Sequence, residues 1–136
     1  MSSSTPILKL NTGASFPALG FGTYSGDPGT SYDAVLHALR SGFRHIDTAF
    51  GYDNETEVGK AIKDFLKEDS SAKRSDIFVT TKITDHLHAP GDVEWCLEES
   101  LKRLGLDYVD LALVHWPIAL EKKDMENHKT DENGKV

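Results

Sequence analysis

Residues Gly42 to Gly59 read GFRHIDTAFGYDNETEVG, and this stretch joins a strand, a loop and a helix in one short run of chain. Its apolar-rich start, FRHID, predicts a buried strand. Asn54 is of a type that often begins a helix, and Glu57 fits the acidic position of a capping box. Between the two elements the chain carries an acid, Asp47, and a phenol, Tyr52. A strand followed directly by a helix predicts one unit of a parallel α/β fold.

The alternation of strand and helix continues on both sides of this stretch. The opening residues ILKLNTGASFPALG, Ile7 to Gly20, predict a β-hairpin that turns at Asn-Thr-Gly. Apolar spacing predicts a third helix with Val93, Cys96, Leu97, Leu101 and Leu104 on its buried face. The full pattern predicts helices over residues 32–39, 54–66 and 90–104, and strands over 19–23, 43–47, 76–83 and 108–117.

This alternation, at a repeat of about 25 to 35 residues, predicts parallel strands joined by crossover helices. With 136 residues, 38% of them hydrophobic, the chain is long enough for one domain with its own core. The predicted strands fit either a small open sheet or half of a closed eight-stranded barrel, which typically needs about 250 residues. The periodicity by itself leaves both folds open.

Polar residues stand at or just beyond the carboxyl ends of three predicted strands, namely Asp47, Lys82 and His115. Tyr52 lies in the loop that leaves the same end of the second strand. Parallel strands place these ends on one face, where α/β folds carry their chemistry. Taken singly, each residue has a structural explanation, such as a helix cap for Asp47 or a snorkelling side chain for Lys82. Taken together, they predict a shared polar pocket.

The composition argues against several classes of function. A net charge of −7 disfavours a nucleic-acid surface, which needs a concentrated basic face. No apolar run approaches the roughly 20 residues of a membrane span, and the start MSSSTPILKL lacks the features of a signal peptide. A single cysteine, Cys96, fits a reducing compartment. We therefore expect a cytoplasmic protein that binds neither nucleic acid nor membrane.

Two other motifs fall short of a binding site. Asp85, His86, His88 and Cys96 resemble a metal cluster only loosely, and their spacing matches no usual zinc pattern, so no metal site is predicted. The run GDPGTS lacks the lysine of a phosphate-binding P-loop, and no G-x-G-x-x-G fingerprint follows the first strand.

Three stretches resemble motifs of the aldo-keto reductase family: GFRHIDTAFGYDNETEVG, VTTKI and LGLDYVDLALVHWP. The resemblance covers almost the whole chain, with the motifs in the family's order. It implies a (β/α)8 TIM barrel whose bottom is plugged by the opening hairpin. On this reading, residues 1–136 are the N-terminal half of a single barrel domain, and the remainder of the barrel is absent from the chain.

The resemblance also implies roles for individual residues. A catalytic tetrad maps onto Asp47, Tyr52, Lys82 and His115. The cofactor is a nicotinamide dinucleotide, usually NADPH, with NADH left open. Its nicotinamide ribose end is expected near Gly22, Thr23, Tyr24 and Asp47, and a small carbonyl substrate is expected against Tyr24, Phe50, Tyr52, His115 and Trp116. The chain departs from many members at Thr84 and Tyr24, where tryptophan is common.

The expected reaction is reduction of an aldehyde or ketone, which needs a hydride on carbon and a proton on oxygen. A phenol normally ionises only near pH 10, and a neighbouring ammonium favours the phenolate. We therefore expect Tyr52 to donate the proton, Asp47 to hold Lys82 beside it, and His115 to orient the carbonyl. The alternatives are a binding or regulatory module, or an inactive fragment whose barrel is completed by a second fragment.

Overall fold

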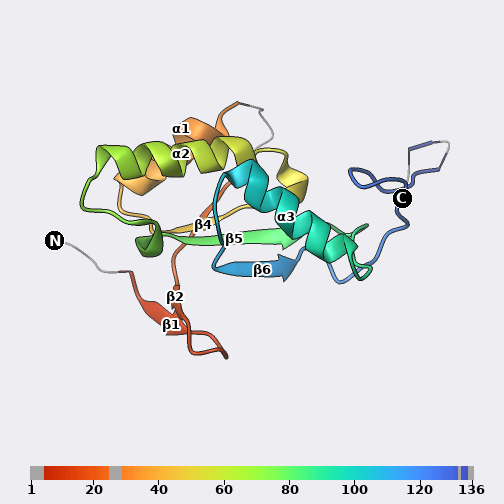
Figure 1. Ribbon diagram of the computed structural model, residues 1–136, viewed down its shortest axis with the longest axis horizontal. Coiled ribbons are helices and arrows are strands. Elements are labelled where there is room, and N and C mark those ends of the chain that lie inside the picture. The colour runs from red at the N-terminus through yellow and green to blue at the C-terminus, as the bar shows by residue number, and fades with distance from the viewer. Residues whose placement is uncertain (1–4, 25–28, 132, 135–136) are drawn as a thin grey trace.

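A computed structural model describes residues 5–24, 29–131 and 133–134, and within them the chain forms a parallel sheet covered by helices (Figure 1). The sheet order is β3-β4-β5-β6, and every neighbouring pair is parallel. The strands are β3 (Phe21–Gly22), β4 (His45–Asp47), β5 (Phe78–Ile83) and β6 (Leu111–Val114). Strands that follow one another in sequence are neighbours in space, which confirms the predicted crossover arrangement.

Helices connect the strands and lie together above the sheet in Figure 1. They are α1 (Ser31–Arg40), α2 (Glu55–Glu68) and α3 (Asp92–Leu104), with short 3-10 turns η1 (Phe50–Tyr52) and η2 (Arg74–Asp76). Gly105 ends α3 in the left-handed conformation, with φ of 62°, and its N–H bonds to carbonyls of the last turn. The predicted elements are confirmed, although the strands are shorter than the apolar runs that predicted them.

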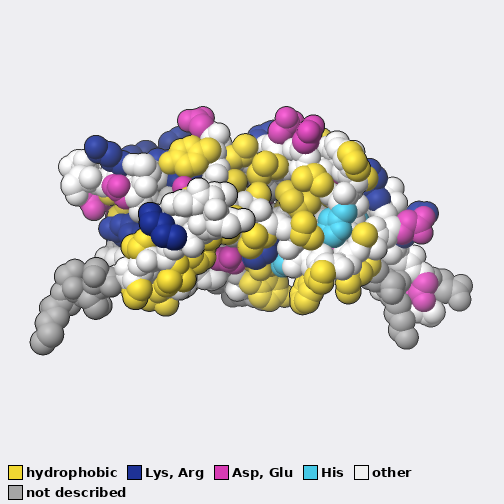
Figure 2. Space-filling model, turned by 90° about the horizontal axis from the view of Figure 1, so that it is seen from below, with side chains coloured by type: hydrophobic (Ala, Val, Ile, Leu, Met, Phe, Trp, Pro, Cys, Tyr) yellow, Lys and Arg dark blue, Asp and Glu magenta, His cyan; other side chains and the backbone are white. Residues whose placement is uncertain are grey.

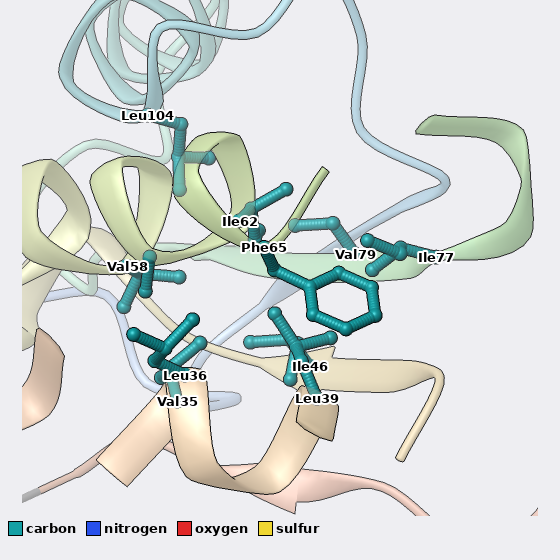
Figure 3. Close-up of a cluster of buried hydrophobic side chains, with 11 residues drawn as sticks. Val35, Leu36, Leu39, Ile46, Val58, Ile62, Phe65, Ile77, Val79 and Leu104 are labelled. Carbon is teal, nitrogen blue, oxygen red and sulfur yellow. The ribbon is translucent and has the colours of Figure 1, made fainter. Parts of the chain in front are cut away.

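The main core lies between α1, α2 and the inner strands. Figure 3 shows its side chains converging, with Val35 and Leu39 from α1, Ile62 and Phe65 from α2, and Ile46 from β4. All of these side chains are buried. Burying one such side chain typically stabilises a fold by about 1.5–3 kcal/mol, so this cluster is what fixes the helices on the sheet.

Helices α2 and α3 approach each other closely at Gly59. A Cβ atom at this position would overlap the backbone carbonyl of Leu104 at the end of α3. Glycine inside a helix normally weakens it by about 1 kcal/mol relative to alanine. Here the missing side chain is what lets the two helices pack backbone to backbone.

The opening hairpin pairs β1 (Ile7–Lys9) with β2 (Ser15–Pro17) and lies below the sheet in Figure 1. It is fixed to the amino ends of β4 and β5 by the rings of Phe16, His45 and Phe78, which meet edge to face. The ring of His45 also bonds to the carbonyl of Pro17 through Nδ1, at 3.2 Å. The hairpin therefore lies at the end of the sheet opposite the candidate site.

Two details of the helix predictions were wrong. Asn54 precedes α2, but its side chain makes no capping bond, and the capping box with Glu57 is absent. The amide is buried and donates instead to the carbonyl of Thr23 and the hydroxyl of Ser31. In α3, Val93 is not buried but 37% exposed, and the ring of Trp95 packs against Phe50 instead.

Hydrophobic side chains are also exposed on the β6 side of the sheet. Val114, Trp116 and Ile118 are each 59% exposed. Figure 2, which views the molecule from below, shows hydrophobic side chains gathered on this face among a few charged ones. Within the described residues, no helix is long and apolar enough to cross a lipid bilayer.

Candidate active site

The strand register brings the predicted polar residues to the same edge of the sheet. Asp47 is the last residue of β4, Lys82 is the penultimate residue of β5, and His115 follows β6 directly. The N–H of His115 still bonds to the carbonyl of Ile83, at 3.0 Å, so its position is fixed by the end of the sheet. Tyr52 ends the turn η1, which leaves the carboxyl end of β4.

Lys82 is the centre of the site. Its Nζ donates to Asp47 Oδ1 at 2.5 Å, to the carbonyl oxygen of Thr48 at 2.9 Å and to the Tyr52 hydroxyl at 3.4 Å. The side chain of Lys82 is 14% exposed and that of Asp47 is 33% exposed, so water only partly screens this ion pair. The arrangement holds one ammonium against a carboxylate and a phenol at once.

Tyr52 is held from several sides. Its ring packs edge to face against Tyr24 and His115, with centroids 5.2 Å and 5.3 Å away. Asp53, the next residue, has a left-handed backbone with φ of 52°, which is uncommon for a residue other than glycine. This turn reverses the chain directly after Tyr52 and leaves the phenol above Lys82.

His115 stacks on Trp116 and faces Tyr52. Burial lowers the pKa of the His115 imidazole, and the nearby Lys82 ammonium lowers it further. The ring is therefore neutral over most of the physiological pH range. A neutral imidazole carries one N–H, which is able to donate a hydrogen bond to a carbonyl oxygen.

The residues expected near the cofactor lie at the end of β3. Thr23 is buried, its N–H bonds to the carbonyl of Asp47, and its hydroxyl has no hydrogen-bond partner. A Cβ atom at Gly22 would meet open space. Tyr24 is 75% exposed and covers one side of Tyr52.

A cavity of about 360 Å³ opens beside His115. Phe50 and Trp116, both expected to line a substrate pocket, do line this cavity, although the Phe50 ring is otherwise buried. Thr84 also lines it, and a hydroxyl therefore stands at the position where the family often has an indole ring. The remaining lining comes from Gly51, Asp53, Asp85, His86, Glu126, Asn127 and His128.

Two residues that support the site were missed or misread in the sequence. Asn54 was interpreted as a helix cap, but it joins the end of β3, the start of α1 and, through a 3.2 Å bond from Thr48, the loop after β4. Glu55 accepts a hydrogen bond from Thr81, the neighbour of Lys82, and burial raises the pKa of its carboxyl group. Only the spatial approach of separate elements reveals these contacts.

A parallel sheet with helices on one face, a hairpin at its amino end and polar side chains at its carboxyl end defines part of a β/α-barrel protein. A sequence model of the Aldo/keto reductase family matches residues 18–128. The chain therefore belongs to the aldo/keto reductase family.

Relatives in sequence and structure agree with this assignment. Over 128 residues the chain is 50% identical to glycerol 2-dehydrogenase (NADP(+)) of Hypocrea jecorina, covering 93% of this chain and 40% of that protein. The aldose reductase of Schistosoma japonicum superposes with a TM-score of 0.87 at 42% identity, over 95% of this chain and 42% of that one. An aldo-keto reductase of Bombyx mori, solved in complex with NADP, gives a TM-score of 0.82 at 38% identity, over 90% and 42% of the two chains.

The chain thus spans about two fifths of the length of these relatives. Its sheet and helices correspond to the N-terminal portion of their (β/α)8 barrel, which confirms the predicted fold class. The alternative of a small open sheet as a fold in its own right is thereby set aside.

Proposed function

We propose that the protein containing this chain reduces aldehydes or ketones to alcohols with NADPH, and that Tyr52 is the proton donor. The observation that carries the proposal is the position of the Lys82 ammonium, which touches both the Asp47 carboxylate and the Tyr52 hydroxyl. Family membership and the NADP(+)-dependent relative support the same reaction class.

The residues at the end of β3 fit the nicotinamide half of such a cofactor. Gly22 leaves open space, and Thr23 offers a buried hydroxyl without a partner. Asp47 keeps a second carboxylate oxygen beyond the one that accepts from Lys82, and this oxygen suits a ribose hydroxyl. When bound, NADPH supplies the hydride.

Side chains of this chain would donate the proton and orient the substrate. Tyr52 donates its hydroxyl proton to the carbonyl oxygen as negative charge develops there. The Lys82 ammonium stabilises the phenolate that remains, and Asp47 keeps this ammonium in place. His115 donates a hydrogen bond to the same oxygen and orients the substrate in the cavity beside Trp116.

We further propose that residues 1–136 form the N-terminal half of one barrel domain, with the remaining strands supplied by further chain or by a second fragment. The coverage of about 40% of the relatives supports this view, as do the exposed side chains of Val114 and Trp116 beside the last strand. The adenine half of the cofactor would contact that missing portion. The proposed partner is a small-molecule carbonyl compound bound in the cavity beside His115.

The test measures NADPH oxidation by the full-length protein with glyceraldehyde. Replacing Tyr52 by phenylalanine should lower kcat by roughly 100- to 10,000-fold, because the proton donor is lost. NADPH affinity, followed by fluorescence quenching, should stay within about twofold because Tyr52 contributes to the proton step and not to cofactor binding.

The matched control is Tyr108→Phe, because Tyr108 lies away from the site beside Arg74 and should leave kcat unchanged. Near-normal turnover by Tyr52→Phe would remove Tyr52 from the mechanism. NADPH binding without turnover in the wild-type protein would favour a binding or regulatory module instead.

A further inference from the structure

A second cluster of chemically active side chains lies at the far side of the same cavity. Asp85 and His86 follow β5, and His128 lies in the segment after β6. One potential ligand atom from each of these residues lies within 4.8 Å of the other two.

The hydrogen bonds around His86 show which of its two ring nitrogens carries a proton and which one faces the carboxylate of Asp85. Nε2 lies 3.4 Å from the carbonyl oxygen of Met125, which only accepts, so Nε2 carries the proton. In a neutral ring Nδ1 then holds a lone pair, and it faces Asp85 Oδ1 at 3.8 Å. The Thr84 hydroxyl, at 3.5 Å from Nδ1, already donates to Asp85 at 2.9 Å.

An imidazole lone pair that faces a carboxylate oxygen is an arrangement that a cation between them would stabilise. A metal ion between Nδ1 and Asp85 would also reach the second imidazole of the cluster, that of His128, whose ring centroid lies 6.0 Å from that of His86. Two imidazoles and a carboxylate are a donor set that suits a divalent transition metal.

The position of His128 is fixed by an anchored turn. Lys122 pairs with His128 in a short antiparallel bridge, and its ammonium forms an ion pair with Asp92 of α3. Glu126, in the same turn, accepts from Arg103 of α3. The imidazole of His128 is therefore presented to the end of β5 by contacts that need no metal.

We propose that Asp85, His86 and His128 bind a divalent transition-metal ion such as Zn²⁺. Zinc ligands lie about 2.0–2.2 Å from the metal, so the ligand atoms, now within 4.8 Å of one another, would have to move closer by up to about 1.4 Å. The Met125 carbonyl orients the His86 ring as the hydrogen-bond partners of metal-bound histidines commonly do. Three protein ligands would leave a fourth position for water.

The test uses the full-length protein after treatment with a chelator. Titration with Co²⁺ should give visible absorption bands of a one-to-one tetrahedral complex, and Zn²⁺ should displace the Co²⁺. His128→Asn and Asp85→Asn should each weaken Zn²⁺ binding, measured by calorimetry, by at least about 10- to 100-fold. Affinity should also fall as the pH drops, because a metal ion binds only the neutral form of an imidazole.

The control is His37→Asn, since His37 is exposed on α1 and should leave Zn²⁺ affinity unchanged. Circular dichroism without metal checks that the two ligand variants fold. The proposal is overturned if no one-to-one complex forms, or if both ligand variants keep the wild-type affinity. These measurements do not depend on turnover, so they are independent of the proposed reductase activity.

Discussion

At the scale of single residues, the candidate site depends on Lys82 having several oxygens to contact. Asp47 balances its charge, the Thr48 carbonyl fixes its direction, and the Tyr52 hydroxyl receives its third hydrogen bond. Such a partly buried ammonium is stable only while its partners remain, because an unpaired charge in this setting is costly. The contacts that hold Lys82 therefore also keep its ammonium against the Tyr52 hydroxyl.

His115 is the residue for which we expect a substrate-dependent effect. Replacement by alanine removes a hydrogen-bond donor to the carbonyl oxygen and should lower kcat by roughly 100- to 1,000-fold for compounds that need this contact. For compounds held by other contacts, kcat should fall less. The variant should therefore lower kcat/KM by different factors for a small aldehyde and for a bulky ketone. An equal loss for every substrate would contradict the orienting role, and His37→Ala is the control.

At the scale of elements, the fold depends on how closely α2 and α3 approach. Gly59 is inside α2, where alanine would ordinarily favour the helix. The close contact with the Leu104 carbonyl reverses this expectation, because a backbone atom cannot move aside as a flexible side chain can.

Gly59→Ala should therefore lower the free energy of unfolding, by about 1–3 kcal/mol or more. Urea denaturation of the full-length protein measures the change. Lys63→Ala, at an exposed position of the same helix, should stay within about 0.5 kcal/mol of wild type. Equal stability of Gly59→Ala and wild type would show that α3 shifts to make room.

At the scale of the whole molecule, two neutral histidines secure opposite ends of the sheet. His45 joins the hairpin to the amino end through Pro17, and its Nε2 bonds to the Thr80 hydroxyl at 3.0 Å. His115 lies at the carboxyl end beside Tyr52. Burial lowers the pKa of both imidazoles below the ordinary value for histidine.

This arrangement predicts a loss of stability in mild acid. Below about pH 6.5 the histidines of the unfolded chain take up protons. In the folded protein, His45 and His115 take up protons only at a lower pH, because the pKa of each imidazole is lowered. The unfolded state therefore binds more protons in mild acid, and the free energy of unfolding falls as the pH drops. Above pH 6.5 these two residues should contribute no such dependence.

Urea denaturation at pH 7.5 and pH 5.5 checks the prediction. His45→Gln should show a smaller difference between the two pH values than wild type, and His37→Gln, at an exposed site, should not. A steeper dependence in His45→Gln would mean that the folded state binds the extra proton.

The open side of the sheet also belongs to this largest scale. The hydrophobic side chains of Val114, Trp116 and Ile118 are exposed near β6, which is an edge strand of the sheet. An uncovered parallel edge with apolar neighbours favours association with further strands. On the proposal that further strands complete a barrel, those strands would bury these side chains.

The sequence by itself determined the alternation of strands and helices and the convergence of Asp47, Lys82 and His115. Both follow from local rules, because apolar spacing sets the element type and parallel strands align their carboxyl ends. Tertiary structure alone decided the rest. The Asn54 side chain bonds to Thr23 and Ser31 on other segments and makes no capping bond at the start of α2. His128 lies beside His86 because the ion pair between Lys122 and Asp92 holds its turn against α3. Such contacts join residues far apart in sequence, and no local periodicity encodes them.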